Sequence, residues 1–280
     1  DPITGAQTKW QMSRPGHHCG NIAAAPNALF FRSGTTAYYD LISDHGTAHF
    51  GAQRPGCWIN LIPANGLVMM PEASSGCVCP FSVHCTIVFA PRKANRVWGT
   101  FSAAKPYYPV QRLAVNFGAP GDRKDANGQL WLGYPRPRRG RLVYPLSLRP
   151  TMAEGGRFVA GNADFAGPAG TADRWIYPSA AVGMKQCDIQ LIGPGGAPRK
   201  YTVRLHFADA ADAKPRRRVF SVSLQGKTVL KNFDIAQAAG GAGKVVVKQF
   251  PGIDVKDVLT IDLSASKGMT LLSGVEITAE

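Results

Sequence analysis

The chain is 280 residues long, 45% hydrophobic and 18% charged, and it carries a formal net charge of +14. This length favours two packed domains, and the hydrophobic content excludes disorder on a large scale. The 31 glycines and 21 prolines predict an all-β protein of short strands and turns, because both residue types interrupt helices.

The first predicted elements are short strands that repeat along residues 1–91. The segments DPITGAQTKW at 1–10 and DLISDHGTAHF at 40–50 each contain an Asp, then a Gly and then an aromatic residue. Strand pairs are expected around Ser33-Gly34 and around Asn65-Gly66. A repeat of about 40 residues made of short antiparallel strands is typical of a β-propeller blade.

This repeat resembles the one in pyrroloquinoline-quinone-type β-propellers, as found in secreted bacterial propeller proteins. The resemblance implies that residues 1–91 form the C-terminal blades of a propeller-like domain. Such rings close with about four to eight blades, and fewer are present here. We therefore expect another chain, or N-terminal blades that precede Asp1, to complete the propeller and cover its exposed strand edges.

Six cysteines occupy positions 19, 57, 77, 79, 85 and 187. Because no Cys or His spacing fits a zinc site, we expect disulfides and no metal. Cys77 and Cys79 face the same side of a strand, so each should pair elsewhere, with Cys19 and Cys57 as the best candidates and the connectivity open. Disulfides indicate an oxidising compartment, so the protein is expected to be secreted or periplasmic. A removed leader is expected, and no apolar run approaches the roughly 20 residues of a membrane span.

Residues 92–109 lose the strand periodicity and gain proline, alanine and basic residues. We interpret this stretch as a linker that packs through Trp98, Phe101, Tyr107 and Tyr108.

Residues 110–280 have the alternation of a β-sandwich or jelly roll. In YTVRLHF, four residues share one face and three share the other, and Phe220, Val222 and Leu224 continue the inward set. Gln225-Gly226 predicts a tight hairpin. The segments KVVVKQF, VLTIDLS and LLSGVEI predict the last strands, and helix is expected only near DIAQAAGG.

The segments VNFGAPGDRKDANGQLWLGY and YTVRLHFADA resemble malectin-like domains. The resemblance implies carbohydrate binding by loops at one end of the sandwich. The side chains that it assigns to such a site are Trp131, Tyr134, Trp175, Tyr177, Asp122, Asp125 and Asp173. Met184 and Lys267 stand where the family has an aromatic and an acidic residue, so a purely structural sandwich, with the tryptophans as packing residues, is the alternative.

Most of the positive charge lies in residues 109–218, which contain 18 basic and 8 acidic residues. Candidate anion-binding arginines form two clusters: Arg136, Arg138, Arg139 and Arg141, and Arg216, Arg217 and Arg218. Guanidinium groups bind sulfate or carboxylate bidentately, which suits an anionic polysaccharide. A solvated basic surface is the alternative, and no motif indicates a nucleic-acid partner.

The segment GDRKDANG offers Asp122, Asp125 and Asn127 as oxygen ligands for calcium. Its basic residues oppose a cation, so we favour a simple turn and expect no cofactor.

Together these patterns predict a non-catalytic carbohydrate-binding or interaction protein, with a glycan as its partner. No catalytic residue is identified, because the chain contains no nucleophile elbow, phosphate loop or dinucleotide motif. Two alternatives stay open. The chain is the C-terminal part of a secreted quinoprotein or polysaccharide-degrading enzyme, or it is a structural subunit of an extracellular assembly.

Overall fold

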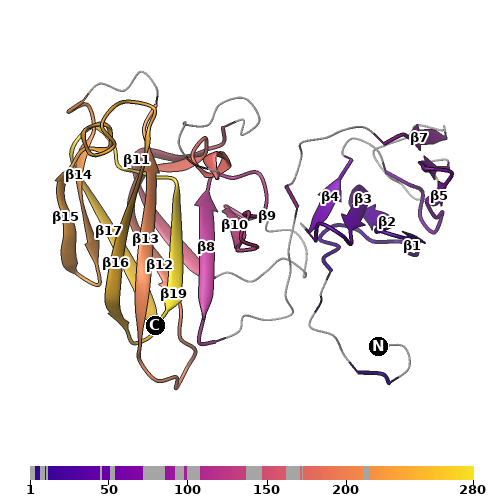
Figure 1. The fold of residues 1–280 in the computed structure, drawn as a ribbon, viewed down its shortest axis with the longest axis horizontal. Coiled ribbons are helices and arrows are strands. Elements are labelled where there is room, and N and C mark those ends of the chain that lie inside the picture. Colours follow the sequence, from indigo (N-terminus) through magenta and orange to yellow (C-terminus); the bar gives the residue numbers. More distant parts are fainter. Residues whose placement is uncertain are drawn as a thin grey trace. The chain divides into compact units, whose positions relative to one another are not determined.

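The computed structural model describes residues 4–6, 10, 12–44, 46–50, 54–71, 86–91, 98–99, 108–136, 147–161, 171, 173–210 and 215–280 (Figure 1). It contains two compact units. The first comprises Asp1–Lys105 and Arg136–Pro145, and the second comprises Pro106–Pro135 and Leu146–Glu280. Most of the expected linker, residues 92–109, lies outside the described residues.

The first unit contains two small antiparallel sheets. In the first sheet the order is β1 (Ala23–Ala25), β2 (Ala28–Ser33), β3 (Thr35–Asp40) and β4 (Thr47–His49), and in the second it is β5 (Ile62–Ala64), β6 (Leu67–Met70) and β7 (Ile87–Phe89). Gly34 turns β2 into β3, and Asn65-Gly66 turns β5 into β6. All three residues have positive φ. Both hairpins predicted from the sequence are confirmed.

A four-stranded antiparallel meander is also the unit of which propeller blades are made. The order of β1 to β4 is therefore compatible with the propeller hypothesis, which stays a prediction. The expected disulfides also stay a prediction, since Cys77 and Cys79 lie outside the described residues. Of their candidate partners, Cys19 is half-buried, and the Cys57 thiol accepts a hydrogen bond of 3.0 Å from Arg32 Nη1.

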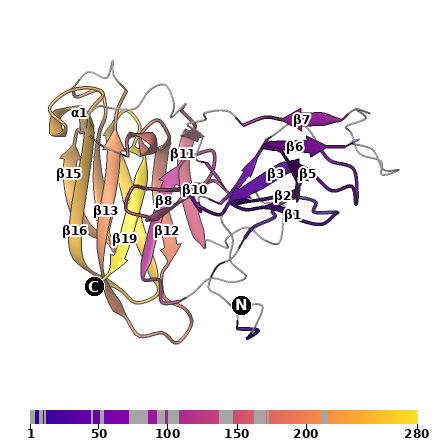
Figure 2. The same cartoon turned by 45° about the vertical axis from the view of Figure 1, so that its right-hand side comes forward.

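The second unit is a sandwich of two six-stranded sheets (Figure 2). Sheet I has the order β16 (Val245–Val255), β13 (Arg199–Ala208), β19 (Gly274–Ala279), β8 (Arg112–Phe117), β10 (Leu130–Tyr134) and β9 (Arg123–Lys124). Sheet II has the order β11 (Leu148–Val159), β12 (Ala180–Gln190), β17 (Val258–Lys267), β14 (Val219–Leu224) and β15 (Lys227–Phe233), with β18 (Leu271–Leu272) paired to β12. Only β8 and β10 pair in parallel among these strands.

The sandwich core follows the alternation of the sequence. On β13 the inward residues Tyr201, Val203, Leu205 and Phe207 are completely buried. The Phe207 ring meets Phe220 of sheet II at a centroid distance of 6.0 Å. Each fully buried side chain of this size contributes roughly 1.5–3 kcal/mol, so these alternating positions are the main source of the unit's stability. The predicted all-β sandwich is confirmed.

Local signals outside the strands are also confirmed. Leu224 pairs with Lys227 across Gln225-Gly226, whose φ values of 51° and 76° fit a two-residue hairpin turn. Helix in the described residues is limited to α1 (Ile235–Ala238) and the 3₁₀ turn η1 (Arg174–Ile176). Among the described residues no helix is long and apolar enough to cross a membrane.

Candidate functional site

On the outer face of sheet I, Ala114 and Gly274 are small residues, and we call the space above them the trough. Strand register places Glu276 opposite Ala114, and Ala114 opposite Trp131. The next row contains His206 opposite Gly274. A Cβ atom on Gly274 would lie 2.9 Å from Trp131 Cζ3, so the missing side chain there makes room for the indole to lie across the trough.

A packed aromatic layer fills this trough. The Trp131 ring contacts Trp175 at a centroid distance of 5.9 Å and His206 at 5.2 Å, both edge to face. Tyr177, which follows η1, lies 6.0 Å from the His206 ring. Trp131, Trp175 and Tyr177 are only 2%, 4% and 7% exposed. Three of the predicted sugar-binding aromatics thus come together, but as the buried floor of the cluster rather than as open stacking platforms.

A chain of hydrogen bonds runs along the edge of this floor. The Tyr177 hydroxyl lies 3.0 Å from His206 Nδ1, and His206 Nε2 lies 2.7 Å from Glu276 Oε1. Burial alone would raise the pKa of Glu276, but the hydrogen bond and charge of His206, with Arg204, outweigh it and hold that pKa below its ordinary value. Burial, with the charges of Glu276 and Asp173, raises the pKa of Tyr177. The carboxylate therefore accepts from Nε2, and the Tyr177 hydroxyl and Nδ1 form the second hydrogen bond of the chain.

Two further carboxylates lie at the rim and orient the indoles. Trp131 Nε1 donates to Asp125 Oδ2 at 3.3 Å, and Trp175 Nε1 donates to Asp173 Oδ1 at 3.1 Å. The pKa of Asp173 is raised by burial and by the charges of Asp125 and Glu276. The Trp175 hydrogen bond opposes this shift without cancelling it. Three carboxylates thus share one small region of the sheet surface, and burial makes the charged form of Asp173 costly there.

Two arginines complete the rim. The Arg123 guanidinium lies 4.7 Å above the centroid of the Trp175 ring, a cation–π contact. Arg204 Nη1 lies 3.9 Å from Glu276 Oε2. Planar carboxylate and guanidinium groups can therefore accept from and donate to a polyhydroxylated ligand above a rigid aromatic base.

Asp122 and Tyr134 serve the fold instead of the cluster. Asp122 is 2% exposed and accepts a 2.9 Å hydrogen bond from the Gly133 amide. The Tyr134 ring packs 5.5 Å from Phe158, and its hydroxyl donates to the Leu148 carbonyl at 3.4 Å. The two predicted site residues are therefore accounted for by structural contacts.

The favoured turn in GDRKDANG is present. Asp125 Oδ1 accepts from the amides of Asn127 and Gln129, each at 2.9 Å, and the Gly128 amide donates to the Asp125 carbonyl at 3.0 Å. Within the described ranges, no group of three His, Cys, Asp or Glu side chains could hold a metal ion.

The sequence patterns did not identify several residues of the cluster. They are Arg123, Arg204, His206, Glu276 and Asn116. Asn116 is 1% exposed, and its side-chain amide has no hydrogen-bond partner among the described residues. A buried amide of this kind is normally satisfied by an ordered water or a ligand hydroxyl. The nearest signal in the sequence was the polar face of YTVRLHF.

The arginines of the two predicted anion-binding clusters differ in their surroundings. Arg138, Arg139 and Arg141 lie outside the described residues, whereas Arg136 is half-buried. Arg218 is committed to the fold, because its Nε donates to Asp209 at 3.1 Å and its Nη1 to the Thr270 carbonyl at 3.2 Å. Arg216 and Arg217 are exposed.

We expect Asp173→Asn to stabilise the protein at neutral pH. A carboxyl whose pKa is raised on folding weakens stability as the pH rises through that pKa. The asparagine removes the cost of burying this charge near other carboxylates, while its oxygen still accepts from Trp175. The gain should be below about 1 kcal/mol, since solvent screens the group, and it should vanish below the unfolded Asp value of about 3.9. Urea unfolding at pH 3 and pH 7 measures it. Equal stability of both proteins at pH 7 would contradict the expected cost of burying the charge.

Comparison with known proteins gives a family match for part of the second unit. Residues 164–278 match the model of the malectin domain. A probable receptor-like protein kinase of Arabidopsis thaliana is 37% identical over 84 residues, which are 28% of this chain and 10% of the kinase. A probable leucine-rich repeat receptor-like serine/threonine-protein kinase of the same plant is 41% identical over 75 residues, 24% of this chain and 7% of that protein. The chain thus spans a tenth or less of these relatives.

A solved structure shares the fold at low identity. A calcium-binding mutant of Bacteroides uniformis β-glucuronidase 2 aligns with a TM-score of 0.50 and 14% identity, covering 96% of this chain and 28% of that one. At this identity the likeness concerns the fold alone.

Proposed function

We propose that the malectin domain at residues 164–278, together with β8, β9 and β10 of the same unit, binds a neutral glycan on the outer face of sheet I. The observation that carries the proposal is the convergence of Asp125, Asp173 and Glu276 over the buried aromatic layer. Carboxylates are strong acceptors for sugar hydroxyls, and a partly buried carboxyl that is retained at a cost in stability, as Asp173 is, is typical of a functional surface.

The unpaired amide of Asn116 adds a second polar group to this face. It lies in register with Gly133 and Gly274, and the Gly121 backbone, Trp131 and Ile176 fill the space beside these glycines. An ordered water beneath the aromatic layer would satisfy this enclosed amide.

The charge of the rim favours neutral over anionic sugars. Asp125, Asp173 and Glu276 outnumber the two guanidinium groups of Arg123 and Arg204. The acidic rim would repel an anionic polysaccharide.

The malectin match also supports an extracellular location for the domain, as part of the same proposal.

Binding to an array of neutral and sulfated glycans by the full chain tests this function. We expect binding to neutral glycans and, for Glu276→Gln, a loss of affinity of about tenfold or more, the change of about 1.4 kcal/mol expected of one charged hydrogen bond. Asp254→Asn is the matched control, since Asp254 lies on the same sheet in an exposed ion pair with Lys200. Retention only of sulfated glycans, or equal losses in both variants, would overturn the proposal.

A further inference from the structure

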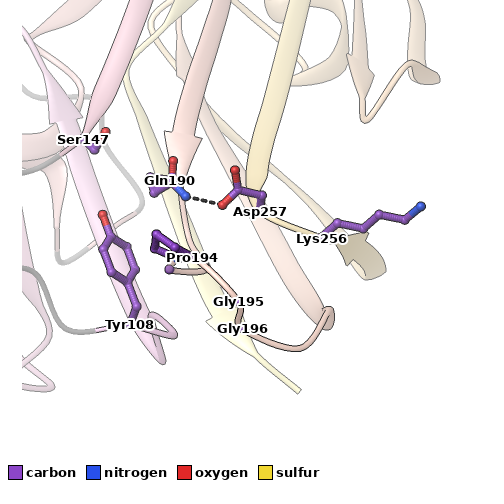
Figure 3. Close-up of a pocket in the computed structure, with 9 residues that line it drawn as sticks. Tyr108, Ser147, Gln190, Pro194, Gly195, Gly196, Lys256 and Asp257 are labelled. Carbon is purple, nitrogen blue, oxygen red and sulfur yellow. Dashed lines mark hydrogen bonds between the residues drawn. The ribbon is translucent and has the colours of Figure 1, made fainter.

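A pocket of about 530 Å³ opens on the second unit, and Figure 3 shows the residues that line it. It is formed where β12 ends at Gln190, where β16 turns into β17 at Lys256 and Asp257, and by the loop 193–196. The η1 turn of the outer-face cluster instead precedes the start of β12. The pocket and the cluster are therefore separate sites on one unit.

The polar wall of the pocket is held in place by a hydrogen-bond network. Gln190 Nε2 donates to Asp257 Oδ1. The backbone carbonyl of Asp257 accepts from the backbone amides of Leu191 and Ile192, each at 3.0 Å, and the backbone amide of Gln190 donates to the Ser147 carbonyl at 3.0 Å. The side-chain amide of Gln190 and the carboxylate of Asp257 are thus fixed side by side, while Asp257 remains exposed to solvent.

The opposite wall is aromatic. Tyr108 lies on one side of the hollow and the Gln190–Asp257 pair on the other, with Pro194 between them (Figure 3). Gly193 lies directly against Tyr108, because a Cβ atom there would come within 3.0 Å of Tyr108 Cβ. Burial and the charge of Asp257 raise the pKa of Tyr108, which agrees with a neutral phenol facing the carboxylate.

Glycine fixes the floor of the pocket. Gly195 has a φ of 74°, and a Cβ atom on Gly196 would lie 2.5 Å from Ile192 Cγ2. The positive φ of Gly195 and the close contact of Gly196 both favour glycine at these positions. Such a loop brings backbone close to a ligand, which is one of the uses of glycine in binding sites.

We propose that this pocket is a second carbohydrate site, which binds one or two neutral hexose units. A volume of about 300 Å³ or more suits a small ligand. The Tyr108 ring offers an apolar surface to the C–H face of a pyranose. The Gln190 Nε2 group donates to the Ile192 carbonyl and to Asp257, so the Gln190–Asp257 pair offers its side-chain oxygens as acceptors to adjacent hydroxyls. Lys256 and Asp257 carry opposite charges, so the pocket has no net charge that would favour an anionic sugar.

The test uses the full chain with cellobiose, lactose and mannobiose as probes, followed by ¹⁵N–¹H spectra. We expect at least one probe to shift the amides of Gly193, Gly195, Gly196 and Asp257, and Tyr108→Ala and Asp257→Asn to weaken that binding about tenfold or more. Glu276→Gln should leave these shifts unchanged, which separates this site from the outer-face cluster. Asp257→Asn keeps the backbone hydrogen bonds, so its result does not depend on refolding of the loop. Absence of shifts with all three sugars, or unchanged binding by Asp257→Asn, would overturn the proposal.

Discussion

Replacing Trp131 with alanine is expected to destabilise the second unit by about 3–5 kcal/mol, the usual cost of truncating a buried tryptophan. The indole is 2% exposed, fills the trough over Gly274 and contacts both Trp175 and His206. Its removal leaves a cavity on a sheet face whose small residues cannot fill it. Urea unfolding followed by far-ultraviolet circular dichroism measures the loss.

Phenylalanine at this position is the matched control. Trp131→Phe keeps an aromatic ring in the trough but loses the hydrogen bond to Asp125, which is worth about 1 kcal/mol. We therefore expect a smaller loss than for alanine. A loss below about 1 kcal/mol for Trp131→Ala would show that the indole is not part of a packed layer.

Replacing Glu276 with alanine is expected to destabilise the protein by about 2 kcal/mol at neutral pH, because a hydrogen bond involving a charged group is lost. His206 Nε2 loses its partner at 2.7 Å, and Arg204 loses its carboxylate. The same change should abolish binding of neutral glycan at the cluster. Thermal unfolding and glycan binding are measured on the same preparation.

The pH dependence of this loss has a defined sign. The folded pKa of Glu276 is depressed, so the stabilisation is complete above the unfolded Glu value of about 4.3 and disappears as the pH falls through the folded pKa. Wild type and Glu276→Ala should therefore converge in acid. A difference between them that stays constant from pH 7 to pH 3 would contradict this origin of the stability.

The sandwich could be predicted from the sequence because several of its strands alternate apolar and polar residues. In YTVRLHF the four inward residues are completely buried, and two-residue turns such as Gln225-Gly226 fix the register of neighbouring strands. These signals are local, so they can be read from a single sequence. The first unit has shorter strands with fewer buried residues, and its propeller assignment depends on contacts that local patterns do not specify.

The cluster could be predicted only in part, because strand register assembles it. Trp131, Trp175 and Tyr177 were identified as aromatic candidates, but their burial depends on Ala114 and Gly274 on neighbouring strands. His206 and Glu276 lie 70 positions apart and meet only through the pairing of β13 with β19. A polar residue on the outer face of a strand usually points to solvent, so the polar face of YTVRLHF did not by itself indicate that His206 meets Glu276.

The central claim is that the carboxylates on the outer face of sheet I bind neutral glycan. Calorimetric titration of the full chain and of Glu276→Gln with the neutral glycan bound most tightly on the array tests it most directly. We predict that Glu276→Gln binds about tenfold more weakly or worse, while Asp254→Asn binds as wild type does. Equal affinity of Glu276→Gln and wild type would contradict the claim.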